Sequence, residues 1–246
     1  KTRAGSLVDA QKPGSMIGFG DVCYRVLDAT MAAIAGAIGD RAIASGSGST
    51  GTAVIAGRQQ RASGDHYFTT LELSSGAYGA RATRDGMNAI RYGPGNAGHI
   101  PIEADEIENP LFFEAYEIVP DTGGAGRFRG GNGFVRAFRV EAERAQICLC
   151  ADRHDTPPPG LFGGKPGSTS RYILNPGTNR EKVLASKTPY IDLEPNTLVR
   201  VQSAGGGGYG DPHERDPALI VEDLKNGYIT AEGAKADYGY TSVTKN

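Results

Sequence analysis

Hydrophobic residues recur with helical spacing in the first strongly patterned segment of the chain, residues 20–39. At 3.6 residues per turn, most of its large apolar side chains fall on one helical face. They are Val22, Leu27, Met31, Ile34 and Ile38. Asp21 can cap the start of this helix, and Gly39 can end it. The pattern predicts a largely buried helix.

Farther along, the hydrophobic period shortens to two, which is typical of strands with one buried face. In residues 133–142, Phe134, Phe138 and Val140 share one face, whereas Arg139 lies on the other. Comparable runs predict further strands. All predicted strands lie at residues 52–57, 65–73, 112–119, 133–142, 145–153, 170–176, 181–187 and 197–204.

Turn-forming residues separate the predicted strands. Those near residues 141–144 and in the sequence Asn-Pro-Gly-Thr-Asn-Arg at 175–180 predict hairpins. Hairpin strands pair in opposite directions, so we expect antiparallel sheet.

The C-terminal part of the chain returns to helical signals. Asp216 as N-cap, Pro217 in the first turn and Gly227 beyond the end predict a helix between them. A second short helix is predicted at residues 231–237, with Thr230 as its N-cap. No internal repeat interrupts this order.

These elements predict an α+β fold with predominantly antiparallel β-sheet, glycine-rich loops, a buried N-terminal helix and one or two C-terminal helices. The expected organisation is a mixed α/β segment at about residues 1–110, a β-rich segment at 111–210 and a helical tail at 211–246. The 246 residues, 39% of them apolar, suffice for a hydrophobic core.

Charge and hydropathy narrow the expected partners. The 26 Lys and Arg residues nearly balance 28 Asp and Glu residues, and no basic stripe is present, so neither nucleic acid nor an anionic membrane is an expected partner. No signal-type region and no membrane-length apolar run is recognised, so we expect a cytoplasmic protein or a piece of a longer cytoplasmic polypeptide. Three cysteines predict reduced thiols, with Cys148 and Cys150 on one strand face.

The 36 glycines are about twice the usual share, and they cluster beside the predicted strands. In the run Ser-Ala-Gly-Gly-Gly-Gly-Tyr-Gly-Asp-Pro at 203–212, glycines 205, 207 and 210 match a dinucleotide fingerprint. Because residues 211–215 separate them from the next helix, a dinucleotide site is not expected. Residues 205–208 are instead expected to adopt backbone conformations closed to other residues. Residues 44–51 are interpreted as a surface connection, with a backbone-lined binding loop as the alternative.

Other motif classes fail on spacing. In residues 157–168, Gly160 is one position too close to Gly164 for a phosphate loop, and Pro166 replaces the hydroxyl residue that would reach magnesium. The four histidines are far apart in sequence, and no metal-binding or nucleophile-elbow motif is present. We therefore expect this chain alone to bind neither ATP nor a metal.

Polar residues at strand ends are the remaining candidates for chemistry. Arg153 and His154 follow a predicted strand and suit an anion clamp and a general acid or base. The alternative is that Arg153 pairs with Asp155 and that His154 bonds a turn. Glu103 is the candidate carboxylate of residues 96–110, and a solvated loop is the alternative.

The glycine loops supply candidates for substrate binding. Asp121 and Arg127 lie among glycines that could form an anion-binding nest, although a tight turn explains the glycines equally well. Asn96, Gly206 and Gly207 complete the predicted substrate-binding set.

Three long motifs in order resemble the C-terminal half of the hydantoinase B family, which includes the B-type component of N-methylhydantoinase, the corresponding half of 5-oxoprolinase and subunits of acetone and acetophenone carboxylases. The motifs are residues 108–140, 151–167 and 203–230. The resemblance covers nearly all of residues 1–246.

The resemblance implies a hetero-oligomer. An A-type subunit uses ATP and magnesium to phosphorylate the substrate, and the B-type component completes the hydrolysis or carboxylation. The resemblance also implies that an N-terminal half of the B-type subunit, which carries a His- and Asp-containing motif associated with a divalent metal, belongs with this chain.

Three functions are compatible with the resemblance. The first is a component of an ATP-dependent cyclic-amide hydrolase of the hydantoinase or oxoprolinase type, in which Arg153, Arg127 and glycine-loop amides contact anionic oxygen. The second is a component of an acetone- or acetophenone-type carboxylase. The third is a non-catalytic structural subunit of such a complex.

Overall fold

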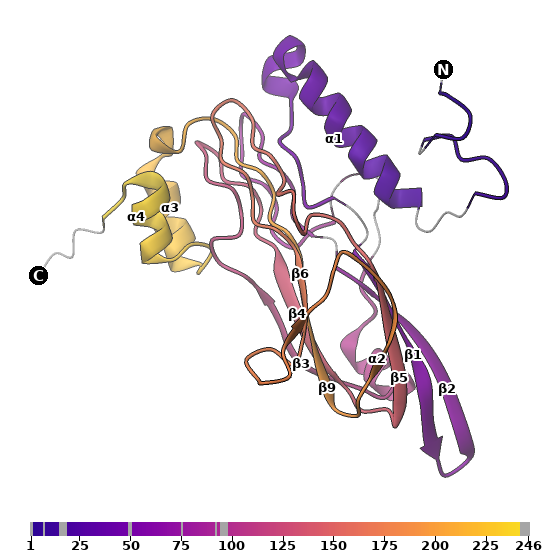
Figure 1. The fold of residues 1–246 in the computed structure, drawn as a ribbon. Coiled ribbons are helices and arrows are strands. Elements are labelled where there is room, and N and C mark those ends of the chain that lie inside the picture. Colours follow the sequence, from indigo (N-terminus) through magenta and orange to yellow (C-terminus); the bar gives the residue numbers. More distant parts are fainter. Residues whose placement is uncertain are drawn as a thin grey trace, which may run out of the picture.

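Two antiparallel sheets packed face to face form the centre of the molecule, and helices lie at its periphery (Figure 1). The computed structural model describes residues 2–6, 8–14, 19–48, 51–74, 76–91, 93 and 98–241. The α+β class and the antiparallel pairing predicted from the sequence are confirmed.

The first sheet has the strand order β2-β1-β5-β8. Its strands are β1 (Thr52–Arg61), β2 (Gly64–Leu73), β5 (Arg144–Cys150) and β8 (Lys187–Leu193). β1 and β2 form a long hairpin whose register joins Thr52 to Leu73 and Arg61 to Gly64. Strands from the mixed and β-rich segments of the sequence therefore share one sheet.

The second sheet has the strand order β3-β4-β9-β6-β7. Its strands are β3 (Leu111–Ile118), β4 (Phe134–Val140), β9 (Thr197–Gln202), β6 (Arg171–Leu174) and β7 (Lys182–Val183). Alternate side chains from both sheets meet in one core, which includes Ile55, Phe138, Ile147, Val199 and Val201, each with 0% exposure. The period of two seen in the sequence thus produces a β-sandwich.

The structure corrects two strand predictions. The hairpin expected near residues 141–144 does not form, because β4 and β5 belong to different sheets. The strand expected at 181–187 is reduced to β7, and the longer β8 follows it instead. β8 contains Pro189, which the sequence pattern counts against a strand, and the edge position of β8 tolerates it. The hairpin at 175–180 joins β6 to β7, as predicted.

Glycine-rich segments that form neither helices nor sheet ladders run side by side above the sandwich. Residues 205–208 lie at the centre of this glycine bundle. Gly206 donates its N–H to Gly131 O (2.9 Å), Gly207 to Ser45 O (2.8 Å) and Gly208 to Lys165 O (3.0 Å). Backbone hydrogen bonds thus join segments that are distant in sequence, and residues 44–48 are buried among them rather than forming a surface connection.

The reason for glycine in this bundle differs from the expected one. None of residues 205–208 has a positive φ, whereas Gly210 does (73°). A Cβ atom at Gly206 would instead collide with the carbonyl oxygen of Tyr78, and one at Gly207 with that of Pro159. Close approach of neighbouring backbones is what requires glycine here.

The N-terminal helix α1 (Phe19–Ile38) has nearly the predicted bounds, but it is not largely buried. Between Val22 and Ile38 only Tyr24 and Ala35 are buried, and Figure 1 shows the helix lying apart from the sandwich. Among the described helices and strands, only the short η1 (Gly39–Arg41) makes more than a marginal contact with it. In the part of the chain that the structure describes, only Val22–Arg41 has the length and mean hydropathy (1.3) of a membrane span.

The remaining helices are short. α2 (Ile102–Glu108) forms in a region expected to be a loop and lies beside the edge strands β2 and β3. The C-terminal η3 (Pro212–Glu214), α3 (Pro217–Lys225) and α4 (Ala231–Tyr238) follow the glycine bundle. The predicted caps are confirmed, since the Asp216 carboxylate accepts from Ala218 N and the Thr230 hydroxyl from Gly233 N.

Candidate functional site

Arg153 lies where β5 leaves the sandwich, and it holds α1 to the glycine bundle. Its Nη2 donates to Asp28 Oδ2 of α1 and to Ser45 Oγ, both at 2.7 Å, and only 7% of the residue is exposed. Burial is the main cause that lowers its pKa, to about 10, so the guanidinium stays charged at neutral pH. Its partner is Asp28 rather than Asp155, the partner considered from the sequence.

His154 is half-buried beside the same loop. Its ring stacks on Tyr172, with centroids 5.6 Å apart, and Nε2 has no hydrogen-bond partner among the described residues. Burial lowers the pKa of His154, so the imidazole is neutral at neutral pH. Nε2 is itself buried, and burial disfavours the protonated ring, so the general acid or base role of His154 stays a prediction.

A small cavity lies close to these residues, between the start of β1 and β6. Ser47, Ser74 and Tyr172 line it, and the Tyr172 hydroxyl donates to Gly51 O at 2.6 Å. Its volume of ≈ 10 Å³ holds about one water molecule and no cyclic amide. The cavity therefore has no room for a substrate, and His154 does not line it. We refer to His154 and the serine loop, residues 44–48, together as the polar corner.

The other predicted residues do not converge on that corner. Glu103 is exposed on α2, which lies beside β2 and β3. Asp121 accepts hydrogen bonds from the N–H and hydroxyl of Thr230 at 2.9 and 2.7 Å, which joins the bundle to the start of α4. Arg127 lies 3.8 Å from the Glu214 carboxylate beside a surface hollow of ≈ 320 Å³.

The predicted amide contacts have another use in this structure. Gly206 and Gly207 are buried, and their N–H groups donate to backbone carbonyls of the bundle. Their assignment to substrate binding stays a prediction that these contacts do not support. Asn96 lies outside the described residues.

A second polar centre, not foreseen from the sequence, lies between the sheets. Arg136 of β4 is 2% exposed, and its Nη1 lies 3.3 Å from Glu72 Oε2 of β2 and 3.0 Å from His99 Nδ1. The guanidinium also stacks over the rings of Phe113 (4.6 Å) and Tyr116 (5.1 Å). Glu72 Oε1 and Arg136 Nη2 are buried without partners among the described residues.

Burial sets the protonation of this centre. It raises the pKa of Glu72 to about 8, against the attraction of Arg136, so the carboxyl is mostly protonated at neutral pH. Burial and the Arg136 charge lower the pKa of His99 to about 4. Because the arginine can only donate, His99 Nδ1 accepts, and the ring proton of the neutral imidazole lies on Nε2. Arg136 and Glu72 are closed to solvent, whereas His99 is partly exposed.

The sequence did contain a signal for this centre. Arg136 is in phase with Phe134 and Phe138 on the apolar face of its strand, and Glu72 is in phase with Phe68. A charged residue at a core position requires a buried partner. The sequence pattern places Arg136 and Glu72 on the buried faces of their strands. It does not show that these two strands, β4 and β2, bring the side chains together.

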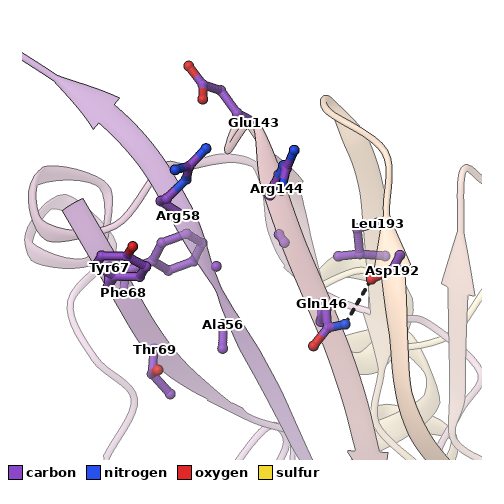
Figure 2. Close-up of a pocket in the computed structure, with 12 residues that line it drawn as sticks. Ala56, Arg58, Tyr67, Phe68, Thr69, Glu143, Arg144, Gln146, Asp192 and Leu193 are labelled. Carbon is purple, nitrogen blue, oxygen red and sulfur yellow. Dashed lines mark hydrogen bonds between the residues drawn. The ribbon is translucent and has the colours of Figure 1, made fainter. Parts of the chain in front are cut away.

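A groove of ≈ 760 Å³ lies on the outer face of the first sheet (Figure 2). Arg58 of β1 lies directly opposite Arg144 of β5, and Tyr67 flanks Arg58 from β2. Gln146 donates to Asp192 across the next strand pair at 2.8 Å. None of the residues predicted to be functional lines this groove.

Among the described residues, no group of three or more His, Cys, Asp or Glu side chains is arranged to hold a metal ion. The β-sandwich, the glycine bundle and the peripheral helices together make a mixed α+β protein. Its described candidate residues lie at separate places and do not form one catalytic pocket.

Comparisons with known proteins identify the family. The sequence profile described as Hydantoinase B/oxoprolinase matches residues 1–212, and the chain belongs to this family. The B-type component of a putative D-/L-hydantoinase from Pseudomonas sp. (strain NS671) is 32% identical over 73% of this chain and 30% of its own length. The beta chain of caprolactamase from Pseudomonas jessenii is 32% identical over 96% of this chain and 42% of its own.

Solved structures agree with this assignment. The crystal structure of the ATP-dependent caprolactamase from Pseudomonas jessenii aligns with a TM-score of 0.83 and 25% identity over 100% of this chain and 44% of that chain. A nucleotide-free acetone carboxylase structure shares the fold, with a TM-score of 0.66 and 22% identity over 81% of this chain and 30% of that chain. The alpha subunit of acetone carboxylase from Xanthobacter autotrophicus is 26% identical over 71% of this chain.

The chain spans about a third to two fifths of the length of the curated relatives it matches. Relatives in this family are subunits of multisubunit ATP-dependent enzymes. The chain thus corresponds to a part of such a subunit.

Proposed function

We propose that this chain is a component of an ATP-dependent amide hydrolase that opens cyclic amides, with a partner subunit supplying the ATP-dependent activation. The main support is the match to caprolactamase, which covers the whole of this chain at a TM-score of 0.83. Ring amides resist attack by water, and phosphorylation of the carbonyl oxygen would lower that barrier.

The choice of a hydrolase is supported by two relatives, the hydantoinase and caprolactamase subunits, which are each 32% identical to this chain. The carboxylase subunits are 26% and 28% identical, and 5-oxoprolinase from Dictyostelium discoideum is 25% identical. The fold agreement is also closer for caprolactamase than for acetone carboxylase, with TM-scores of 0.83 and 0.66. A carboxylase component remains the second candidate, because both activities occur within one family.

In the proposed hydrolase, His154 is the proton-transfer residue of this chain. Its neutral ring and unpaired Nε2 suit proton acceptance, and the serine loop beside it is held by the Arg153 contact to Ser45. Arg153 is a positioning residue, since its charge is already paired with Asp28. ATP, magnesium and any divalent metal would be held by the A-type subunit and by the remaining part of the B-type subunit.

An assay of the complete complex tests the proposal. The purified complex is incubated with ATP and hydantoin, 5-oxoproline or caprolactam, and ring opening and phosphate release are followed together. A parallel reaction contains acetone or acetophenone with labelled bicarbonate. Ring opening coupled to ATP cleavage is expected; label fixed into a ketone without any ring opening would show that the carboxylase interpretation is the right one.

His154→Gln tests the role of this chain in that reaction. The neutral glutamine keeps polar character but cannot take up a proton, so we expect kcat to fall at least a hundredfold with little change in KM. Exposed His213→Gln on η3 is the matched control and should retain full activity. Equal activity of both variants would remove His154 from the mechanism.

A further inference from the structure

The side of α1 that faces away from the glycine bundle has the composition of a buried helix. We define the outer face of α1 as Cys23, Val26, Thr30, Ala33, Ile34 and Ala37, which lie at helical spacing and are exposed. Val26 is 47% exposed and Ile34 40%. Between Val22 and Ile38, none of the described exposed side chains is charged. A helix face in permanent contact with water normally carries charged residues.

The opposite side of α1 fixes the helix in place through polar contacts. Asp28 pairs with Arg153 at 2.7 Å and with Arg25 at 3.1 Å, and Arg91 donates to the Tyr24 hydroxyl at 3.0 Å. The helix is therefore tethered along one side and uncovered along the other. Only 11% of the apolar window Val22–Arg41 is buried in this structure.

Small residues on the outer face allow another backbone to come close. Ala33 and Ala37 alternate along the helix with the larger Val26 and Ile34, which provides ridges and shallow grooves for a packed helix or strand. A membrane span does not fit α1, because Arg25 and Asp28 place charged groups within the helix and Asp28 is paired with Arg153.

The length of the relatives points to the occupant. The alignment with caprolactamase covers this whole chain, α1 included, yet more than half of the caprolactamase chain lies outside it. The sequence comparison agrees, because this chain covers only 42% of the length of the beta chain of caprolactamase. In these relatives the additional polypeptide belongs to the same chain as the matched part. The outer face of α1 is the longest uncovered apolar helix surface among the described residues.

We propose that the outer face of α1 is the docking surface for the additional polypeptide of a hydantoinase B-type subunit, the part that relatives possess beyond the match to this chain. The proposal rests on the proposed function only in placing this chain within a B-type subunit. It assigns α1 to an interface within that subunit and not to a membrane or to a second copy of this chain.

Cys23 allows a direct test, because it lies on the outer face and is a free thiol. In the complete B-type subunit, purified without substrate or ATP, alkylation of Cys23 by iodoacetamide is followed by mass spectrometry. The reference is a cysteine introduced by Val221→Cys on α3, since Val221 is an exposed helical residue at 50%. We expect Cys23 to react at least tenfold more slowly than the reference. Equal rates would overturn the proposal.

A pair of matched substitutions provides a second readout. Val26→Glu places a charge in the proposed interface, and Val221→Glu makes the same change on α3 at similar exposure. Val26→Glu should reduce the association of this chain with the additional polypeptide at least tenfold, whereas Val221→Glu should not. Equal association of both variants would also contradict the proposal.

Two further outcomes would assign the surface differently. Protection of Cys23 that is present only in a fraction with twice the mass of one subunit on size-exclusion chromatography would indicate a second copy. Protection that appears only with phosphatidylcholine and phosphatidylglycerol vesicles would indicate a membrane. Either result overturns the proposal. A subunit that protects Cys23 but opens no ring contradicts the proposed function alone, and an active hydrolase with a reactive Cys23 contradicts this inference alone.

Discussion

Glu72 illustrates how a single buried carboxyl can make folding depend on pH. Its side chain is 4% exposed and faces Arg136, while Asp105 adds a second acidic group nearby. In the unfolded chain its pKa is about 4.5, and in the folded chain it is about 8. Between these values the folded state keeps a proton that the unfolded state has lost, so stability falls as pH rises.

We therefore predict that Glu72→Gln flattens the pH dependence of stability between pH 6.5 and 8. In the wild type, Glu72 alone should lower the unfolding free energy by up to about 1.4 kcal/mol per pH unit between pH 6.5 and 8. Below pH 6.5, His99 acts in the opposite direction, because its pKa is lowered to about 4 in the folded state. Urea unfolding at several pH values measures both effects.

The control for this measurement is Glu103→Gln, which changes an exposed carboxyl of α2 in the same way. It should follow the wild-type curve. If Glu72→Gln follows it too, then Glu72 is ionised in the folded state throughout this range, and the protonation assigned to the buried centre is wrong.

Arg153 gives a second prediction at this scale. The Asp28 side chain is only 12% exposed in the structure. Arg153→Ala leaves this carboxylate with Arg25 as its remaining partner, and we expect a loss of about 3 kcal/mol in the unfolding free energy. Adding Asp28→Ala should recover part of that loss, because the unpaired carboxylate is then gone. A double-mutant cycle from urea unfolding measures the coupling, and additive losses would show that the pair contributes little.

At the residue scale, the sequence predicted residue types better than their partners. Arg153 and His154 were recognised at a strand end, but Asp28, which pairs with Arg153, lies 125 positions earlier. Arg136 was overlooked although its phase placed it in the core. Partners of this kind are set by tertiary packing, which local spacing does not encode.

At the scale of elements, the glycine bundle shows why glycine content alone does not predict the reason for glycine. The content is about twice the usual share, and either positive φ angles or close approach of neighbouring backbones can produce it. Helix caps at Asp216 and Thr230 were predictable because their hydrogen bonds close within three residues. The sequence predicts the bounds of α1 closely but not its exposure. Periodicity identifies an apolar helix face, but it does not show what covers that face.

The bundle leads to a prediction for glycine replacements. Gly206→Ala should lower the unfolding free energy by about 3 kcal/mol, because its Cβ would meet the backbone of Tyr78 and Gly79, which cannot move aside cheaply. Gly36→Ala in α1 is the matched control: nothing lies within 4 Å of its Cβ, and alanine favours a helix by about 1 kcal/mol. Thermal or urea unfolding compares the two; equal stabilities would refute the packing explanation.

At the scale of the whole molecule, a buried ionic network joins the C-terminal helices to the glycine bundle. Arg215 donates to both oxygens of Asp85 at 2.8 and 2.7 Å and to Asp223 at 2.7 Å. Asp223 on α3 also accepts from the Arg129 Nε and Nη2, both at 3.2 Å. Two cations thus share one carboxylate of α3.

Asp223→Asn should release α3 and α4 from the bundle, because both arginines then lose a buried counter-charge. Limited trypsin digestion is the measurement, and we expect cleavage near Lys225 and Lys235 to become at least tenfold faster than in the wild type. Glu222→Gln, an exposed neighbour on the same helix, is the control. Unchanged cleavage in Asp223→Asn would mean that apolar packing, not the ionic network, holds these helices.

The glycine bundle also has a consequence for how the chain reaches this fold. Its central segment, residues 205–208, bonds to Ser45, Ala80, Gly131 and Lys165, so the contacts span up to 162 positions in sequence. Contacts of such high order cost much chain entropy before they give stability, and they slow folding. During synthesis the earlier segments cannot complete the bundle until residues 205–208 have left the ribosome, so the bundle closes only after more than 160 residues of this region have been made.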